Sequence, residues 1–454
     1  MAPYSHEMDE KFLRMTSTPI PKLIIQLGLP TIASMLISSI YNMADTYFVG
    51  TLGKSASGAI GVVFSLMAIL QAFGFLFGHG SGSILSRKLG QHDADSASRF
   101  GSTGFFLAVS TGGLIGVLGL CFLTPFMYLL GSTQTILPFA RQYAFFILLG
   151  APFFTGSCVL NNILRYEGMS LFAMMGLVSG GVLNMLLDPL FILVFRMGTA
   201  GAGLATALSQ CVSFCILLYM FLSGKTACRL RLSNFTRNPA EVLQIFATGL
   251  PSLIRQGLGS LSGMLLNHQA GLYGDAAVAA MSIVNRITQF IFSVNIGVGQ
   301  GYQPVASFNY GAKKYSRVKQ GFWFASAFGE LLICVSSICC LVFAEPLVRL
   351  FQKDPSVVVI GTPALQFQCI ACFLLPFTTC GNMMFQSVGK SGRASFLSTL
   401  RNGLCFIPLI LILPYFFQLK GIMLAQPISD VMAFLVSVPM VLHFLRHLPQ
   451  DDAP

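Results

Sequence analysis

Charged residues are scarce in this chain. Of its 454 residues only 9% are Asp, Glu, Lys or Arg, whereas 54% are hydrophobic. Roughly a quarter of the residues of a soluble domain are charged, so this composition excludes a soluble globular protein. The few charges lie in the breaks between long apolar runs. We therefore expect a membrane protein.

Groups of side chains that bind metals or perform catalysis are also lacking. Of the 12 cysteines, only Cys228 lies outside the apolar runs, and the Cys369-x-x-Cys372 pair has no His or acidic residue nearby. The glycine triplets at 78–82 and 297–301 follow no strand pattern and carry no phosphate-binding Lys. They indicate close helix packing instead. We expect no cofactor, and a membrane-embedded enzyme is only a remote alternative.

Apolar runs long enough to cross a bilayer, which takes about 20 residues, recur along the whole chain. The first half has predicted spans at 23–50, 56–85, 101–124, 138–164, 171–194 and 202–223, and the second half at 242–270, 277–308, 320–343, 357–388, 394–417 and 421–445. Several runs exceed the minimum, which predicts tilted or kinked helices. The expected fold is an all-α polytopic membrane protein with twelve transmembrane helices.

The basic residues indicate how these spans are oriented. With the N-terminus in the cytoplasm, the loops on that side carry Arg87, Lys88, Arg99, Arg165, Lys225, Arg229, Arg231, Arg237, Lys313, Lys314, Arg317, Lys319, Lys390 and Arg393. The opposite side has only scattered cations such as Lys54, Arg196 and Arg349. By the positive-inside rule, both termini are predicted to be cytoplasmic. The net charge of +11 then reflects topology and attraction to membrane lipids, and we expect no nucleic-acid partner.

The first half of the sequence repeats in the second half with a shift of 221 residues. The matched positions are mostly Gly, Ala and Pro: 28–30 with 249–251, Gly50 with Gly271, Gly53 with Gly274, Ala56 with Ala277, Ala59 with Ala280, Gly78 with Gly299 and Gly80 with Gly301. Such residues set where helices bend and approach closely. Six spans per copy is an even number, so both copies enter the membrane in the same sense. We expect two six-helix lobes related by a pseudo-two-fold axis along the membrane normal, an arrangement typical of transporters.

The breaks between apolar runs divide the chain into five predicted parts. These are a cytoplasmic N-terminal segment 1–22, an N-lobe 23–224, a cytoplasmic linker 225–241, a C-lobe 242–445 and a cytoplasmic tail 446–454. Residues 1–22 are polar and lack the short apolar core and cleavage site of a signal peptide. We therefore expect the first span to be retained.

Two aspartates lie deep inside predicted spans of the N-lobe. Asp45 and Asp188 are about 22 and 17 residues into helices that start inside, and Thr206 lies near the start of a helix that begins outside, so all three share a depth. Asn184 precedes Asp188 by one helical turn. An ionised Asp in the membrane costs roughly 2.5–3.5 kcal/mol on insertion scales and needs a partner, water or protonation. This set can share a proton or offer oxygen ligands to Na⁺.

A structural role is the alternative, in which each aspartate caps or bends its own helix, as Asp188 before Pro189 is placed to do. The internal repeat separates the two readings. The matching positions in the second copy are Leu266 and Leu409. Because the architecture is duplicated and the acids are not, the repeat favours a functional role.

At these residues the chain resembles the multidrug and toxic compound extrusion (MATE) transporters, over nearly its whole length. The resemblance rests on Asp45 followed by an aromatic residue and Gly50, on Asn184-x-x-x-Asp188-Pro189, and on Gly203-Leu204-Ala205-Thr206. In the branch with acids in the N-terminal lobe, the residues matching Asp45, Asn184, Asp188 and Thr206 form the cation-coupling site. The resemblance also implies a bend of the first helix at Pro30, and export of amphiphilic, often cationic compounds in exchange for H⁺ or Na⁺.

Further polar residues lie inside the predicted C-lobe spans. Arg255 and Gln256 occupy the helix in which other branches of the family place a coupling glutamate. Arg255, Arg286 and Arg401 are expected to pair with Glu330 or Asp430, to snorkel toward an interface, or to contact substrate. Arg286 and Arg401 are also close enough to the cytoplasmic ends of their spans to contact lipid phosphate or a gate. Three arginines also keep open a flippase for lipid-linked precursors, which would bind pyrophosphate in a cationic cavity.

The sequence therefore predicts a secondary active transporter, not an enzyme. We expect a cation-coupled antiporter that works by alternating access, with H⁺ favoured over Na⁺ and small amphiphilic molecules as substrates. Its predicted location, from the resemblance, is the plasma (inner) membrane of a prokaryote, where it is expected to act as a monomer.

Overall fold

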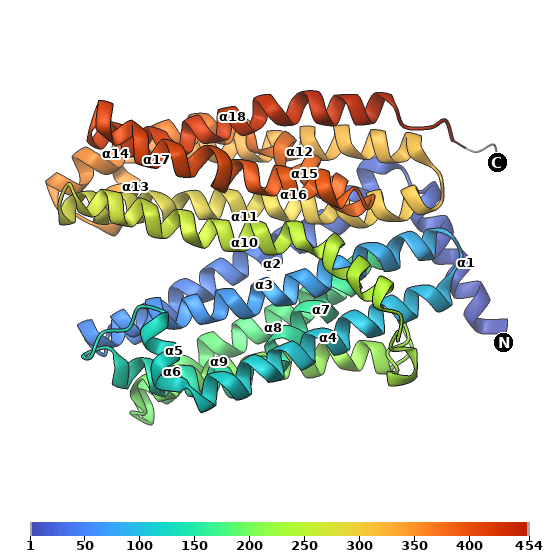
Figure 1. The fold of residues 1–454 in the computed structure, drawn as a ribbon, viewed down its shortest axis with the longest axis horizontal. Helices are drawn as coiled ribbons and strands as arrows, with labels where there is room; N and C mark the ends of the chain where they lie inside the picture. The colour runs from blue at the N-terminus through green and yellow to red at the C-terminus, as the bar shows by residue number, and fades with distance from the viewer. Residues whose placement is uncertain (1, 452–454) are drawn as a thin grey trace. The chain divides into compact units, whose positions relative to one another are not determined.

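The structure, a computed structural model, describes residues 2–451 and contains no β-strand in that range. The first half forms α1 (Ala2–Ser17), α2 (Ile20–Gly50), α3 (Lys54–Gly90), α4 (Ala94–Cys121), α5 (Leu123–Leu129), α6 (Leu137–Leu149), α7 (Ala151–Tyr166), α8 (Ser170–Pro189), the π-helix η1 (Leu190–Val194), α9 (Gly198–Leu222) and the 3₁₀-helix η2 (Leu232–Asn234). The second half forms α10 (Pro239–Gly271), α11 (Asp275–Gly311), α12 (Tyr315–Val342), α13 (Ala344–Phe351), α14 (Pro355–Cys372), α15 (Leu375–Ser387), α16 (Ser391–Thr399), the π-helix η3 (Leu400–Cys405), α17 (Phe406–Phe417) and α18 (Leu419–Arg446) (Figure 1).

Each of the twelve predicted spans has a helix, or a broken helix, as its counterpart. In the described part of the chain, ten continuous helical stretches are long and apolar enough to cross a membrane. The pair α6 and α7, bent by 54°, supplies one further broken span. The counterpart of the predicted span 242–270 is α10, which also carries Glu241, Arg255 and His268. The all-α polytopic fold is confirmed.

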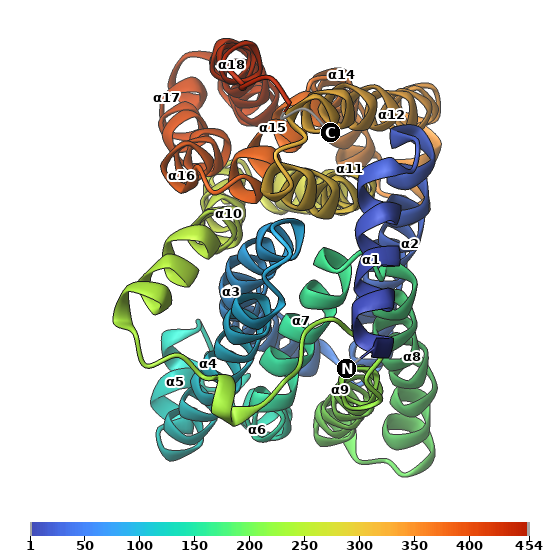
Figure 2. The ribbon, with the colours of Figure 1, turned by 90° about the vertical axis from the view of Figure 1, so that its right-hand side faces the viewer.

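The described residues pack as two compact units. Unit 1 holds the residues up to Arg14 and Ala33–Leu253, and unit 2 holds Met15–Ile32 and the residues from Ile254 onward. Each unit is a bundle of long helices, seen end-on in Figure 2. The breaks within α2 and α10 fall shortly after the repeated prolines Pro30 and Pro251. The N-terminal half of each of these two helices thus packs with a different unit from its C-terminal half.

Glycines allow these half-helices to pack against their units. In unit 1, a Cβ at Gly249 would stand 1.8 Å from the carbonyl oxygen of Leu76, and one at Gly80 would stand 2.3 Å from that of Ile245. In unit 2, a Cβ at Gly301 would stand 2.5 Å from Cα of Gly28. No side chain fits at such distances, so the prediction that the glycine triplets mark close helix packing is confirmed.

The turns repeat as well as the helices. Gly53 and Gly274 precede α3 and α11 with φ of 114° and 98°. His92 and Lys313, also 221 residues apart, both adopt a left-handed conformation, with φ of 59° and 57°, which is uncommon for residues other than Gly. The repeat predicted from the sequence is therefore present in the backbone.

The predicted linker is held against unit 1 by hydrogen bonds to its backbone. The buried carboxylate of Glu167, at the end of α7, accepts from the backbone N–H groups of Ala227 and Cys228 at 2.8 Å each. It also accepts from Lys11 Nζ of α1 at 2.6 Å. On α4, Ser102 Oγ donates to the carbonyl oxygen of Arg229 at 3.1 Å.

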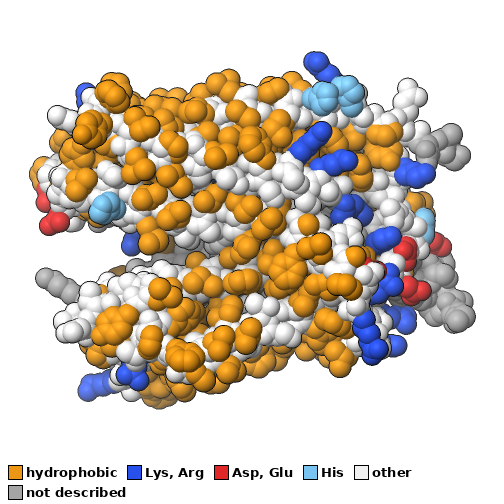
Figure 3. Space-filling view, viewed as in Figure 1, with side chains coloured by type: hydrophobic (Ala, Val, Ile, Leu, Met, Phe, Trp, Pro, Cys, Tyr) orange, Lys and Arg blue, Asp and Glu red, His pale blue; other side chains and the backbone are white. Residues whose placement is uncertain are grey.

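Lys and Arg side chains gather toward the end of each unit where the chain termini lie, while hydrophobic side chains cover the middle (Figure 3). This distribution suits a helical bundle surrounded by lipid. The predicted terminal segments 1–22 and 446–454 extend beyond the described residues at Met1 and at 452–454.

Candidate functional site

Three of the four predicted cation-site residues lie together in unit 1, where the side-chain amide of Asn184 donates hydrogen bonds to the other two. Asn184 and Asp188 lie one turn apart on α8, and Thr206 lies on α9. Asn184 Nδ2 donates to Asp188 Oδ1 at 3.4 Å and to Thr206 Oγ1 at 3.3 Å. All three side chains are buried.

The fourth residue, Asp45 on α2, reaches this group through Tyr143 of α6. The Tyr143 hydroxyl donates to Asp45 Oδ2 at 2.8 Å and also lies close to Thr206. Sequence reasoning did not identify Tyr143. The available signal was a hydroxyl group inside an apolar span whose matching position in the second copy is Ala364.

Small residues and a proline explain this convergence. Gly203 of α9 lies against the backbone of Tyr143, where a Cβ would stand 2.6 Å from the carbonyl oxygen. Gly176 of α8 lies equally close to the side chain of Leu217. After Asp188, Pro189 cannot donate a backbone hydrogen bond, and the chain widens into the π-helix Leu190–Val194. The helices therefore approach closely enough for short polar side chains to meet.

The site has more acceptor atoms than donors. Asp45 Oδ1, Asp188 Oδ2 and Asn184 Oδ1 are buried and accept no hydrogen bond from a described residue. Neither carboxylate forms an ion pair with a described Lys, Arg or His side chain. An uncompensated buried carboxylate is costly unless it is protonated or binds a cation. The arrangement is therefore chemically suited to take up a proton or a hard monovalent cation.

A transition-metal or zinc site finds no support in the described side chains. Among them, no group of three or more His, Cys, Asp and Glu residues is placed to hold a metal ion. Cys369 and Cys372 are buried in the apolar core of unit 2.

The predicted polar residues of the C-lobe occupy separate elements. Arg401 pairs with Asp430, with 2.6 Å between Nε and Oδ1, so of the two predicted acidic partners the structure selects Asp430. Arg255 of α10 donates weakly to Asn382 Oδ1 at 3.5 Å. Its neighbour Gln256 is half-buried on the same helix, and Arg286 is exposed on α11.

Pro30 is half-buried inside α2, which continues as a helix on both sides of it. The missing N–H group at this position weakens the helix and makes it a natural point of bending.

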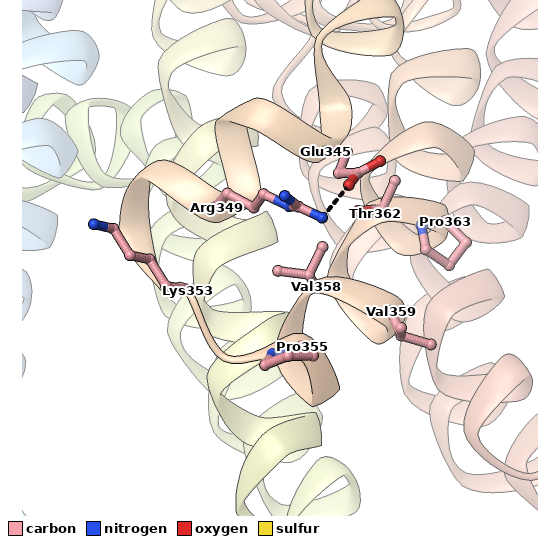
Figure 4. A pocket seen from close by; sticks show the side chains of 8 residues that line it. All are labelled: Glu345, Arg349, Lys353, Pro355, Val358, Val359, Thr362 and Pro363. Atoms are coloured by element: carbon pink, nitrogen blue, oxygen red, sulfur yellow. Dashed lines mark ion pairs between the residues drawn. The ribbon is translucent and has the colours of Figure 1, made fainter.

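A pocket of about 740 Å³ lies between α13 and α14 of unit 2. Figure 4 shows Arg349 directed toward Glu345, one helical turn away on α13, and their ion pair measures 2.6 Å. Both side chains are more than half exposed. The pocket contains none of the predicted site residues.

Comparison with known proteins places these features in a family. The family model MatE matches residues 30–190 and again 251–412, one match in each copy of the repeat. The multidrug export protein MepA of Staphylococcus haemolyticus (strain JCSC1435) is 26% identical over 446 residues, covering 98% of both chains.

Solved structures agree in fold. An outward-facing multidrug resistance MATE family transporter of the MOP superfamily superposes with a TM-score of 0.91 at 24% identity, covering 96% of this chain and 98% of the other. A MATE structure in a bent conformation gives a TM-score of 0.89 at 25% identity, covering 97% and 98%. These neighbours have twelve helices in two lobes, which agrees with the predicted fold class. The chain therefore belongs to the MATE family, and it is a multi-pass membrane transporter, not an enzyme.

Proposed function

We propose that this chain is an antiporter that exports amphiphilic, often cationic drugs or metabolites in exchange for a cation. The observation that carries the proposal is the pair of buried carboxylates, Asp45 and Asp188, which lack a cationic partner among the described side chains. The names of the relatives, multidrug export proteins, support the substrate class.

The coupling ion is proposed to be H⁺, with Na⁺ as the alternative. Tyr143 and Asn184 already donate to one oxygen of each carboxylate. One oxygen per acid is left, which is sufficient for a proton. A metal cation that prefers oxygen ligands requires several of them around it at once. Thr206 and Asn184 Oδ1 would have to complete such a site.

In the proposed mechanism, the N-lobe 23–224 and the C-lobe 242–445 alternate in access, and protonation at the acid pair favours release of substrate outward. Bending of α2 at Pro30 accompanies this step. A MATE structure described as bent supports the idea that such conformations occur in the family. The protein is proposed to act as a monomer in the plasma (inner) membrane, with both termini in the cytoplasm.

A flippase for lipid-linked precursors receives less support. Binding of pyrophosphate calls for several uncompensated cations in one place, whereas Arg401 is paired with Asp430 and Arg255 lies on another helix, α10. Arg286 lies exposed on another helix.

The test is dye efflux from proteoliposomes, with imposed pH and Na⁺ gradients varied separately. We expect the parent protein to export a cationic dye on a pH gradient, and Asp45→Asn and Asp188→Asn each to abolish this export. Asp95→Asn, an exposed substitution at the start of α4, is the matched control and should retain it. Full gradient-driven export by both site variants would refute the coupling role. If a Na⁺ gradient alone drives export, the coupling ion is Na⁺ and not H⁺.

A further inference from the structure

A second buried polar cluster lies in unit 2, centred on Asp430 of α18. Its carboxylate is completely buried and accepts three hydrogen bonds. Gln368 of α14 donates to Oδ2 at 2.9 Å, Gln426 to Oδ1 at 2.9 Å, and Arg401 Nε to Oδ1 at 2.6 Å. Asp430 is therefore well satisfied, in contrast to the acids of unit 1.

The backbone that carries Arg401 is an irregular segment held from two sides. Arg401 lies in the π-helix Leu400–Cys405, whose wider turn frees backbone carbonyl groups. Ser429 of α18 donates to the carbonyl oxygen of Arg401, and Ser262 of α10 donates to that of Asn402 at 2.6 Å. π-Helical turns occur frequently at functional sites, and here two serines fix the position from which the arginine extends.

The guanidinium of Arg401 has N–H groups that no described residue accepts. Only Nε is used by Asp430, and neither Nη group forms a hydrogen bond with a described residue. The side chain is 20% exposed, so these groups are accessible. The ring of Phe292 on α11 lies beside them, with its centroid 4.6 Å from Cζ. The two Nη groups and an aromatic face thus form one accessible surface.

The depth of this surface excludes lipid headgroups as its partners. Arg401 lies about 15 Å along the helix from Ser391, and Asp430 about 16 Å from Leu419, by the rise of an α-helix. Both residues are therefore near the middle of their spans. Arg401 matches Gly180 of the first copy. In the last helix of each copy the shift is 220 residues, as Gly201 and Gly421 show, so Asp430 matches Gln210, and the charged pair belongs to the second copy alone.

We propose that Arg401 and Phe292 form a binding site for the carboxylate of an aromatic amphiphile. This rests on the proposed export function and specifies its substrate class: the transporter would accept zwitterionic molecules as well as cations. Paired N–H groups of a guanidinium match the two oxygens of a carboxylate. Asp430 holds the guanidinium in place and offsets part of its charge, which keeps the bound carboxylate releasable.

The test compares two dyes that share one chromophore. Rhodamine 110 carries a free carboxylate, and rhodamine 123 is its methyl ester. Binding is measured by fluorescence anisotropy on the purified full-length protein in nanodiscs, without any ion gradient. The main variant is Arg401→Gln combined with Asp430→Asn, which keeps the site neutral and leaves no unpaired buried charge. Arg349→Gln, at an exposed ion pair on α13, is the control.

We expect the double variant to bind rhodamine 110 at least about tenfold more weakly than the parent does, which is the loss typical of a charge-assisted hydrogen bond. Its affinity for rhodamine 123 should stay within about twofold of the parent's affinity for that dye. Arg401→Lys, which keeps the charge but not the paired donors, should also weaken rhodamine 110 binding. An equal loss for both dyes, no loss for rhodamine 110, or no rhodamine 110 binding by the parent would overturn the proposal. Gradient-driven efflux of rhodamine 123, measured separately, tests the antiport function itself.

Discussion

Replacing Glu167 with Gln is expected to release the linker from unit 1. The carboxylate is the acceptor for the N–H groups of Ala227 and Cys228 and the ion-pair partner of Lys11. A Gln side chain offers a single carbonyl oxygen, so at least one buried N–H group loses its acceptor. Leaving such a group unsatisfied costs about 1–3 kcal/mol.

The loss of the ion pair between Lys11 and Glu167 makes a smaller contribution to the free energy of linker release. Lys11 is 20% exposed and can turn toward water, so this contribution stays below about 1 kcal/mol. Together the two effects lower the free energy of linker release by about 1–4 kcal/mol, which raises the population of the released state roughly 5- to 900-fold.

Cys228 provides a reporter inside the linker. Its thiol is buried, and burial, reinforced by the nearby carboxylate of Glu167, raises the pKa of the thiol well above its usual range. In the parent protein the thiol is therefore both inaccessible and protonated at neutral pH. Release restores an ordinary thiol pKa of about 8.5, and since the thiolate is the reactive form, alkylation accelerates and does so increasingly as pH rises from 7 toward 8.5.

The assay is a time course of maleimide labelling, with Cys228 resolved by peptide mass spectrometry. We expect labelling of Glu167→Gln to be roughly 5- to 900-fold faster than that of the parent. Glu345→Gln, the same change at the exposed ion pair with Arg349, should leave the rate at Cys228 unchanged. A Glu167→Gln rate equal to that of this control would show that the carboxylate does not hold the linker.

Two further substitutions test the packing of the repeat by apparent thermal unfolding in detergent. Gly249→Ala should destabilise the protein strongly, because its Cβ would stand 1.8 Å from the Leu76 carbonyl oxygen. A Cβ at Gly257, on the same helix, would meet nothing within 4 Å, so Gly257→Ala should be neutral or stabilising by up to about 1 kcal/mol. Equal effects of the two substitutions would contradict the close-packing argument. Asn161 and Asn382 each donate to a backbone carbonyl at 2.7 Å. Asn161→Ala should cost about 1–3 kcal/mol and Asn382→Ala more, because Asn382 has further side-chain partners; a smaller loss for Asn382→Ala would refute this.

That the residues of the predicted cation site lie close together follows in part from helix geometry. Asn184 and Asp188 are one turn apart, and the depth of Asp45 and Thr206 follows from counting along straight helices. Tyr143 was not predictable in this way. Its position depends on how α6 rotates and packs against Gly203, which periodicity does not specify.

The partner of Arg401 illustrates a similar limit. The sequence left Glu330 and Asp430 as candidates, and the choice depends on which faces of separate helices meet. The π-helix at Leu400–Cys405, which turns Arg401 toward Asp430, has no marker as clear as the proline that precedes η1. Partners that join distant helices follow from packing, which a single sequence does not encode locally.

The packing of the two halves of α2 with different units has a consequence for the folding of the chain during its synthesis. Residues 15–32 leave the ribosome early, yet they pack with unit 2, where Gly28 lies against Gly301. At a synthesis rate of about 5–20 residues per second, the interval between residue 32 and residue 301 lasts roughly 15 to 55 s. During it, the first half of α2 must wait in the bilayer without its native neighbours, and an early contact with unit 1 would trap the nascent protein. Late assembly of this segment therefore makes the complete chain, and not either copy of the repeat, the unit that reaches the native fold.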